Sequence, residues 1–265
     1  MFNTGYADKE GNIFFLYNAK LPYRKNNYNW STVVPGNTSN TLWGEFLDYN
    51  KLPKILNPES GYIQNCNNGP IYSINNYNSL IDSNEYIGIE TTNTNRSIRS
   101  NDLFNSYDLI SYADFKQIKF DLKYSDSSNI AHLVNRTLDL IKNKKNKKLS
   151  QAYQILDNWD LMTDKENLNA ALPIISFSKF IDTDYKSITD NMILDELNNG
   201  IKFLYKHHKK IKLPWGDVNK LIRGTTTLPL SGGPDISRAI YGIKTKNGLL
   251  KGVAGDAYMA LIQWD

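Results

Sequence analysis

Three asparagines stand around the only cysteine of the chain, with Asn65, Asn67 and Asn68 beside Cys66. Turn-forming residues on both sides predict a short strand over 62–67. On an extended backbone, Asn65 and Asn67 face the same side. Side-chain amides held on a rigid strand can donate hydrogen bonds to a developing negative charge, as in an oxyanion hole. The alternative is that these amides only satisfy the neighbouring turns, and the local sequence leaves both interpretations open.

Two arginines form a second group that could take part in chemistry. Arg96 and Arg99 lie where a helix is expected to begin, with Ser100 as the capping residue of a helix over 102–110. A cation is slightly unfavourable at a helix N-terminus, because the backbone dipoles place partial positive charge there. The position indicates either a partner elsewhere in the chain or plain exposure to solvent.

Other reactive side chains lack the neighbours that their chemistry requires. Cys66 has no base close to it in the sequence, so a cysteine nucleophile is unsupported. The glycine-rich segments 231–234 and 252–255 do not have the spacing of a phosphate-binding loop and are expected to form turns. No metal site is expected, because the three histidines have no carboxylate or sulfur partners at workable spacing. These histidines are His132, His207 and His208.

The composition predicts a packed, globular chain. Of the 265 residues, 40% are hydrophobic and 12% aromatic, which is enough for a core. The net charge of +4 is too small to indicate nucleic-acid binding. The lysine run at 142–148 could contact phosphate, but without interleaved aromatic residues it is expected to be a solvated loop. One cysteine excludes an internal disulfide, and the absence of a long apolar run predicts no membrane span.

Helical spacing of apolar residues dominates the middle of the chain. Ser111 can cap a helix over 113–120, and apolar residues recur at helical spacing over 130–141. The strongest amphipathic pattern runs over 188–205, and its apolar positions include Met192.

Strand patterns occupy the two ends of the chain. A hairpin turn is expected at 8–12, and a further strand over 28–34. Near the C-terminus, strands are expected over 227–230, 238–245 and 253–264.

The sequence therefore predicts a β-rich part (1–98), a mainly helical part (99–223) and a second β-rich part (224–265). This plan is that of one α+β domain with a helical insertion, whose sheet is completed from both ends. An apolar strand that ends at Asp265, and another that begins almost at Met1, suggest a piece of something larger.

The segment Asn57-Pro-Glu-Ser-Gly-Tyr-Ile-Gln-Asn-Cys-Asn-Asn68 resembles the oxyanion segment of the penicillin acylase family. This family of N-terminal-nucleophile hydrolases includes the penicillin, aculeacin and acyl-homoserine-lactone acylases. Further matches occur in the family's order and cover nearly the whole chain. They are Trp30–Gly36 with Trp43-Gly44, Leu156-Asp-Asn-Trp-Asp160, Leu228-Pro-Leu-Ser-Gly-Gly-Pro-Asp235 and Gly252-Val-Ala-Gly-Asp-Ala-Tyr258.

The resemblance implies a fold and a set of roles. The fold would be part of a four-layer αββα sandwich, and this chain would be the interior and later part of the family's β chain. Asn67 takes the place of the asparagine that donates to the oxyanion. Arg96 takes the place of the arginine that holds this asparagine, with Arg99 as the alternative. Asn65 and Tyr62, near the same segment, are expected to line the substrate pocket.

The sequence also departs from the family's pattern. The family nucleophile is a serine at the first position of the β chain, and its own α-amine is the base. This chain begins Met1-Phe2, so we expect the nucleophile, the histidine that follows it, the α chain and the last part of the β chain to lie outside it. No cofactor is expected. Some members bind structural calcium, so the complete protein could hold it, but no ligand is assigned here.

The implied function is hydrolysis of linear amide bonds in N-acyl compounds, such as β-lactam side chains or acyl-homoserine lactones. The segment alone is expected to be inactive. The alternative is a non-catalytic, acylase-like scaffold that binds acylated ligands or a partner protein. Family members are typically periplasmic or secreted, and the same localisation is expected here. Neither nucleic acid nor a membrane span is expected.

Overall fold

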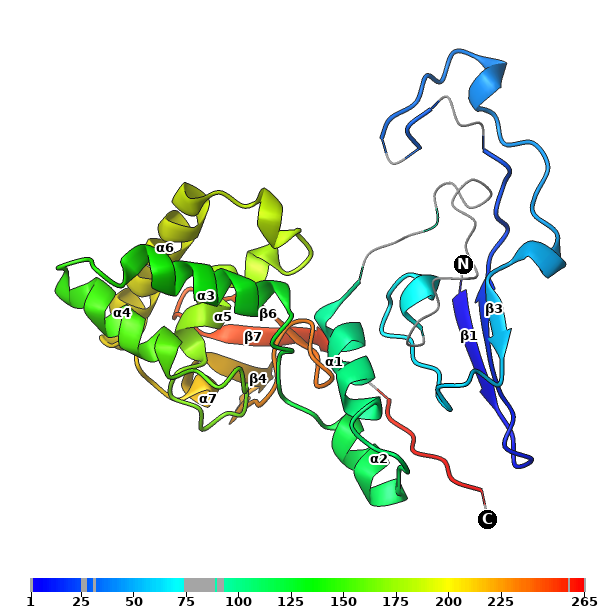
Figure 1. The fold of residues 1–265 in the computed structure, drawn as a ribbon. Helices are drawn as coiled ribbons and strands as arrows, with labels where there is room; N and C mark the ends of the chain where they lie inside the picture. The colour runs from blue at the N-terminus through cyan, green and yellow to red at the C-terminus, as the bar shows by residue number, and fades with distance from the viewer. Residues whose placement is uncertain are drawn as a thin grey trace. The chain divides into compact units, whose positions relative to one another are not determined.

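The chain forms two compact units. The computed structural model describes residues 2–24, 28–30, 32–73, 89, 93–256 and 258–264. Unit 1 is Met1–Ser97 with Ile262–Asp265, and unit 2 is Ile98–Leu261. Figure 1 shows the ribbon of both units. Within the described ranges, no helix combines the length and apolar character needed to cross a membrane.

Unit 1 is built on a small antiparallel sheet with the strand order β1-β2-β3. The strands are β1 (Phe2–Ala7), β2 (Ile13–Asn18) and β3 (Lys54–Leu56). Alternation along β2 directs Phe15 and Tyr17 into the core, where they are almost fully buried. They pack with partners from the loops around the sheet, which are Leu21, Leu47, Leu52 and Ile89.

The expected hairpin turn at 8–12 joins β1 to β2. Asp8 accepts hydrogen bonds from the backbone and side-chain nitrogens of Asn12, at 2.8 and 3.0 Å. These bonds favour the ionised carboxylate, so they lower the pKa of Asp8. The hairpin also supports the candidate site, because the Asn12 side chain accepts a hydrogen bond from Asn57, at the start of the segment that carries Asn67.

The strand expected over 28–34 is wrong, because residues 28–30 and 32–34 have no strand pairing. The physical reason is a local turn. The amide and hydroxyl of Thr32 both donate to the carbonyl of Asn29, at 3.2 and 2.9 Å. The described residues of unit 1 also form short 3-10 helices, η1 (Ser39–Thr41), η2 (Tyr49–Lys51) and η3 (Pro70–Tyr72).

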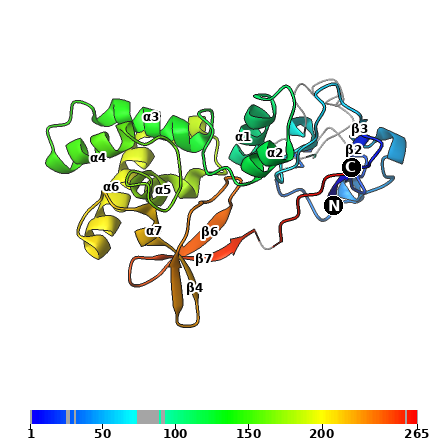
Figure 2. The same ribbon diagram turned by 90° about the horizontal axis from the view of Figure 1, so that it is seen from below.

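Helices are the main regular elements of unit 2, and Figure 2 shows them from a second side. Helix α1 begins before the unit boundary. The α-helices are α1 (Asn95–Phe104), α2 (Tyr112–Lys119), α3 (Asn129–Ile141), α4 (Lys147–Asp157), α5 (Ala171–Phe177), α6 (Asp190–His208) and α7 (Trp215–Val218). The 3-10 helices are η5 (Ser178–Phe180) and η6 (Tyr185–Ser187).

Side-chain caps explain where several helices begin. Ser111 forms a capping box with Asp114 at the start of α2, as expected from the sequence. The Thr189 hydroxyl caps α6 by accepting the backbone amide of Met192, the third residue of the helix. Ser100 does not cap a helix and lies inside α1 instead. Thr94, one residue before α1, has the capping role, because its hydroxyl accepts the amide of Ser97 at 3.1 Å.

Helix α6 organises the core of unit 2. Ile193, Leu197, Ile201 and Leu204 recur every three or four residues and are buried. Every residue of α5 is buried as well, and α5 packs along α6. Met192, which the pattern assigned to the apolar face, is 42% exposed because it lies in the first turn beside the buried stripe.

The sheet of unit 2 has the strand order β5-β4-β7-β6, with β4 parallel to β7. Its strands are β4 (Asn219–Arg223), β5 (Thr226–Pro229), β6 (Ile240–Lys244) and β7 (Leu250–Gly255). Strand β4 lies within the part expected to be helical. The strand expected over 253–264 is short, because β7 ends at Gly255 and the described residues 258–264 are unpaired.

The turn at Gly232 connects this sheet to α7 through hydrogen bonds. The Gly232 carbonyl accepts hydrogen bonds from the indole Nε1 of Trp215 at 2.7 Å and from the side-chain Nδ2 of Asn219 at 3.2 Å. Gly232 has φ +98°, and a Cβ there would lie 2.4 Å from the Arg238 carbonyl oxygen. Gly224, in the β4–β5 turn, has φ +56° but open space around it.

We expect Gly232→Ala to lower the free energy of unfolding by about 2–4 kcal/mol, since both backbone strain and a clash with backbone oppose it. Gly224→Ala, the matched control, meets only the backbone strain and should cost about 1–2 kcal/mol. Urea unfolding followed by far-UV circular dichroism measures both. Equal costs for the two variants would show that the close approach at Gly232 is unimportant.

Candidate oxyanion site

The segment that carries the candidate residues is anchored at its start by Asn57. The Asn57 Oδ1 accepts the backbone amide of Ile13 at 2.8 Å, and its Nδ2 donates to the Asn12 side chain at 3.0 Å. Asn57 has φ +47°, and Gly61, which closes the following turn, has φ +71°. Asparagine and glycine adopt this left-handed region most readily. The turn therefore fixes the segment to strand β2 of unit 1.

The segment over 62–67 is irregular, so the expected strand is wrong. Gln64 explains its path. The backbone amide of Gln64 donates to the Ser73 carbonyl at 2.8 Å. Its side-chain Nε2 donates to the Ser97 hydroxyl at 2.8 Å and to the Tyr72 carbonyl. These contacts join the segment to η3 and to the first turn of α1. Long-range hydrogen bonds of the Gln64 side chain thus take the place of the backbone hydrogen-bond ladder that a strand would have.

The three asparagines have different roles in the structure. The Oδ1 of Asn65 accepts the backbone amide of Asn67 at 3.1 Å, and the Oδ1 of Asn68 accepts the backbone amide of Cys66 at 2.8 Å. Asn65 and Asn68 therefore satisfy local turns. Asn67 has φ +61°, so it does not share an extended face with Asn65 as the sequence predicted. Within the described ranges, Asn67 is the one of the three whose side chain contacts a residue far away in the sequence.

That residue is Arg96, 29 positions further along the chain. Its Nη2 donates to the Oδ1 of Asn67 at 3.2 Å. A guanidinium has only donors, so the amide oxygen must face it and the amide nitrogen must point away. Asn67 is exposed, and its Nδ2 has no acceptor among the described residues. The arrangement presents an N–H group to whatever binds beside it.

Thr94 holds the two halves of this arrangement together. Its hydroxyl donates to the Cys66 carbonyl at 3.4 Å while it accepts the amide of Ser97. The start of α1, and with it Arg96, is therefore fixed against the asparagine segment. Neither Thr94 nor Gln64 was singled out from the sequence. A threonine directly before a helix is a recognisable N-cap signal in a sequence, whereas no local sequence feature identifies Gln64 as an anchor.

Arg99, the alternative partner, is occupied elsewhere. It forms a bidentate pair with Asp121, at 3.1 Å from Nε and 2.9 Å from Nη2. The hydrogen bond to this carboxylate raises the pKa of Arg99. The geometry thus brings Asn67 together with Arg96 and not with Arg99.

The two residues expected to line a substrate pocket differ in exposure. Tyr62 is 9% exposed and lies in the interior of unit 1. Asn65 is exposed at the turn that it stabilises. Their contact with a substrate stays a prediction.

The candidate site offers an exposed N–H donor but no histidine, since residues 1–97 include none. Cys66 is half-buried and is not part of a disulfide. In the described part of the chain, no three histidine, cysteine, aspartate or glutamate side chains gather as a metal site would require. The chemistry that this group of residues offers is stabilisation of negative charge on a neighbouring oxygen.

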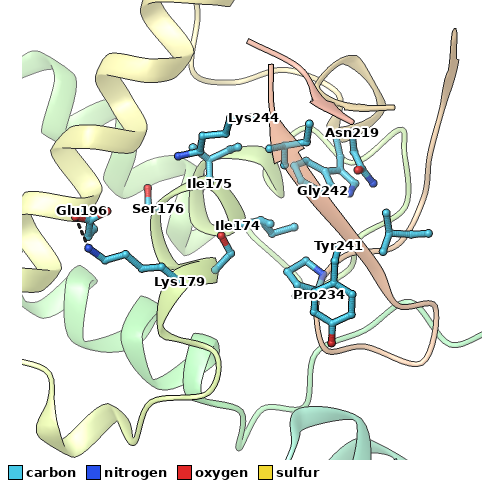
Figure 3. A pocket seen from close by; sticks show the side chains of 14 residues that line it. Ile174, Ile175, Ser176, Lys179, Glu196, Asn219, Pro234, Tyr241, Gly242 and Lys244 are labelled. Carbon is cyan, nitrogen blue, oxygen red and sulfur yellow. Dashed lines mark ion pairs between the residues drawn. The ribbon is translucent and has the colours of Figure 1, made fainter. Parts of the chain in front are cut away.

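A separate pocket of about 300 Å³ lies in unit 2, lined by residues of α5, α6 and β6 (Figure 3). Ile174 and Ile175 contribute apolar surface, and the Lys179 ammonium pairs with Glu196 at 2.6 Å. This volume is at the lower limit for small-molecule pockets. Its lining includes Ser176, whose buried hydroxyl has no hydrogen-bond partner among the described residues and is therefore not paired with a base.

The two arginines are expected to respond differently to substitution. Arg96→Ala should lower the free energy of unfolding by less than Arg99→Ala does, since Asn67 is neutral and exposed and water can replace its lost donor, but it should release the Asn67 side chain. Arg99→Ala should cost roughly 1–3 kcal/mol, because it leaves Asp121 without its guanidinium partner. Urea unfolding measures the stabilities, and the side-chain NH₂ resonances of Asn67 in an ¹⁵N-correlation spectrum report its environment. A shift of those resonances in Arg99→Ala but not in Arg96→Ala would contradict the assignment.

Comparison with known proteins provides the family. The sequence model of the penicillin amidase family matches residues 1–264. The penicillin G acylase of Escherichia coli is 40% identical over 68 residues, which are 26% of this chain and 8% of that protein. The solved thermostable penicillin G acylase from Alcaligenes faecalis, in its orthorhombic form, matches with a TM-score of 0.51 and 16% identity.

The structural match covers 89% of this chain and 51% of the Alcaligenes chain, so this chain spans about half the length of that relative. It confirms the expected α+β class and the N-terminal-nucleophile hydrolase fold. Because the family's sequence model covers nearly all of the chain, this protein belongs to the penicillin amidase family.

Proposed function

We propose that the protein containing this chain hydrolyses linear amide bonds of N-acyl compounds, and that Asn67 stabilises the oxyanion. The observation that carries the proposal is the 3.2 Å hydrogen bond from Arg96 to the Asn67 oxygen. It leaves the Asn67 N–H group exposed, as a donor to a substrate oxygen must be. Family membership supports the amide-hydrolase class.

The proposed reaction is acyl transfer. A serine hydroxyl, at the N-terminal position that the family resemblance implies, attacks the amide carbon while its own α-amine takes the proton. The carbonyl oxygen becomes negatively charged and accepts a hydrogen bond from Asn67 Nδ2. The C–N bond then breaks, the amine leaves with a proton, and water hydrolyses the acyl ester. An oxyanion donor of this kind contributes roughly 2.7–4 kcal/mol to transition-state stabilisation.

Arg96 is proposed as a positioning residue. By donating to Oδ1 it selects the amide orientation that places Nδ2 toward the substrate. Its positive charge also polarises the amide, which makes the N–H group a stronger donor. Two anchors, Thr94 and Gln64, keep the helix of Arg96 at the right distance from the segment.

The substrates, the residues near the acyl group, the other chains and the localisation are proposed from the family resemblance. The substrates would be compounds such as β-lactam side chains or acyl-homoserine lactones, with Tyr62 and Asn65 near the acyl group. Further parts of the acylase, including an α chain, would supply the nucleophile and the rest of the pocket. The complete protein would be periplasmic or secreted, and it could hold structural calcium through residues outside this chain.

In the complete protein, Asn67→Ala is expected to lower kcat about 10²–10³-fold with a small change in KM, because the donor acts on the transition state. Steady-state hydrolysis of a chromogenic N-acyl amide measures this. Asn143→Ala, which removes an exposed asparagine from a loop of unit 2, is the matched control and should keep the parent kcat. Equal activity of Asn67→Ala and the parent would contradict the oxyanion role.

The purified 265-residue chain alone is expected to show no amide hydrolysis, since the proposed nucleophile is not among its residues. The same chromogenic assay at high protein concentration tests this. Turnover by the chain alone would rule out the N-terminal serine mechanism. A complete protein without activity on any N-acyl amide, but with measurable affinity for one, would favour the non-catalytic scaffold.

A further inference from the structure

The lysines of unit 2 are unevenly distributed along the sequence. Three segments, 142–148, 202–212 and 244–251, contain thirteen lysines and neither aspartate nor glutamate. The whole chain has 31 basic and 27 acidic side chains, so the remaining sequence carries a net negative charge. The modest total charge of +4 therefore conceals a strong separation of charge.

The fold brings the first two segments together. Segment 142–148 leads into α4, and segment 202–212 includes the end of α6. The Tyr205 hydroxyl of α6 donates to the Gln151 side chain of α4 at 2.9 Å. The Lys148 ammonium lies 5.4 Å from the centre of the Tyr205 ring. Figures 1 and 2 both show α4 beside α6.

The third segment contacts the same end of α6. The His208 ring nitrogen lies 3.0 Å from the carbonyl of Gly248, in the turn between β6 and β7. The Lys244 ammonium lies 5.0 Å from the centre of the Phe203 ring. The three segments therefore form one surface, which we call the basic patch. Its exposed lysines are Lys142, Lys144, Lys145, Lys147, Lys148, Lys202, Lys206, Lys209, Lys210, Lys212, Lys244 and Lys246.

Very little negative charge neutralises the basic patch. Among the described residues, its only ion pair joins Lys142 to Asp139 at 3.2 Å. The partial negative charge at the end of α6 offsets only part of the remainder. Burial lowers the pKa of His207, and the adjacent Lys206, His208 and Lys209 lower it further. Like charges gathered at one surface repel one another unless an anionic partner or salt screens them.

The chemistry of the basic patch favours a lipid surface over nucleic acid. It contains lysines but no arginine, and lysine is a point charge that does not read phosphate in a bidentate manner. Proteins that bind single-stranded nucleic acid stack bases on aromatic rings. Here the nearby rings, Phe203 and Tyr205, are half-buried, with lysine ammoniums placed over their faces. A bilayer with anionic lipids requires only clustered positive charge, typically roughly 4–8 basic residues.

We propose that the basic patch docks this protein onto the surface of a bilayer that contains anionic phospholipids. The attachment is electrostatic and peripheral, and it uses lysines on three different segments that only the folded unit 2 brings together. It is independent of Asn67 and of amide hydrolysis.

Co-sedimentation of the full chain with vesicles tests the proposal. Vesicles of phosphatidylglycerol and phosphatidylcholine should bind the chain at about 0.1 M salt and release it near 0.5 M, because salt screens exposed charges. Vesicles of pure phosphatidylcholine should not bind it. The triple variant Lys144→Glu, Lys145→Glu, Lys147→Glu should bind the anionic vesicles at least about 10-fold more weakly.

Three further arms decide the outcome. A second triple variant, Lys206→Gln, Lys210→Gln, Lys212→Gln, should also lose affinity, and circular dichroism checks that both triple variants are folded. The control exchanges exposed lysines outside the patch (Lys9, Lys116 and Lys186) for glutamate, and it should bind like the parent. Absence of vesicle binding, or equal losses in the control, would overturn the proposal. Salt-sensitive binding of an oligonucleotide without binding to anionic vesicles would overturn it in favour of nucleic acid.

Discussion

A guanidinium donates hydrogen bonds and accepts none, and this constraint determines the orientation of Asn67. The two ends of an amide side chain have nearly the same shape, so packing alone would not distinguish them. Arg96 does so through charge and hydrogen bonding at 3.2 Å. The contacts of Thr94, Gln64 and Asn57 maintain the geometry of this hydrogen bond, because each fixes either the helix of the arginine or the segment of the asparagine. Together they hold the Asn67 N–H group in its exposed position.

The parts that the sequence predicted well depend on local physics. Ser111 and the hairpin at 8–12 are satisfied by neighbours within four residues, and α6 follows from the spacing of its apolar residues. The irregular path over 62–67 could not be predicted, because Gln64 is held by Ser97, which is 33 residues away. The choice between Arg96 and Arg99 depended equally on a distant residue, Asp121.

The basic patch illustrates the limits of reading charge from a sequence. The net charge of +4 excludes a uniformly basic protein, but it does not describe where the charges lie. The lysine run at 142–148 by itself has the character of a solvated loop. Its significance changes once α6 and the β6–β7 turn add further lysines on the same surface. Tertiary structure thus creates a property that none of the three segments has alone.

The left-handed backbone of Asn67 has an evolutionary consequence. Its φ of +61° suits glycine best, asparagine next and most other residues poorly. In the proposed mechanism, one residue therefore meets two separate demands, a backbone conformation and an amide donor. Relatives under selection for catalysis would keep asparagine here, whereas a lineage released from catalysis would retain only the conformational demand. Glycine at this position in a related sequence would then mark the loss of the reaction without loss of the fold.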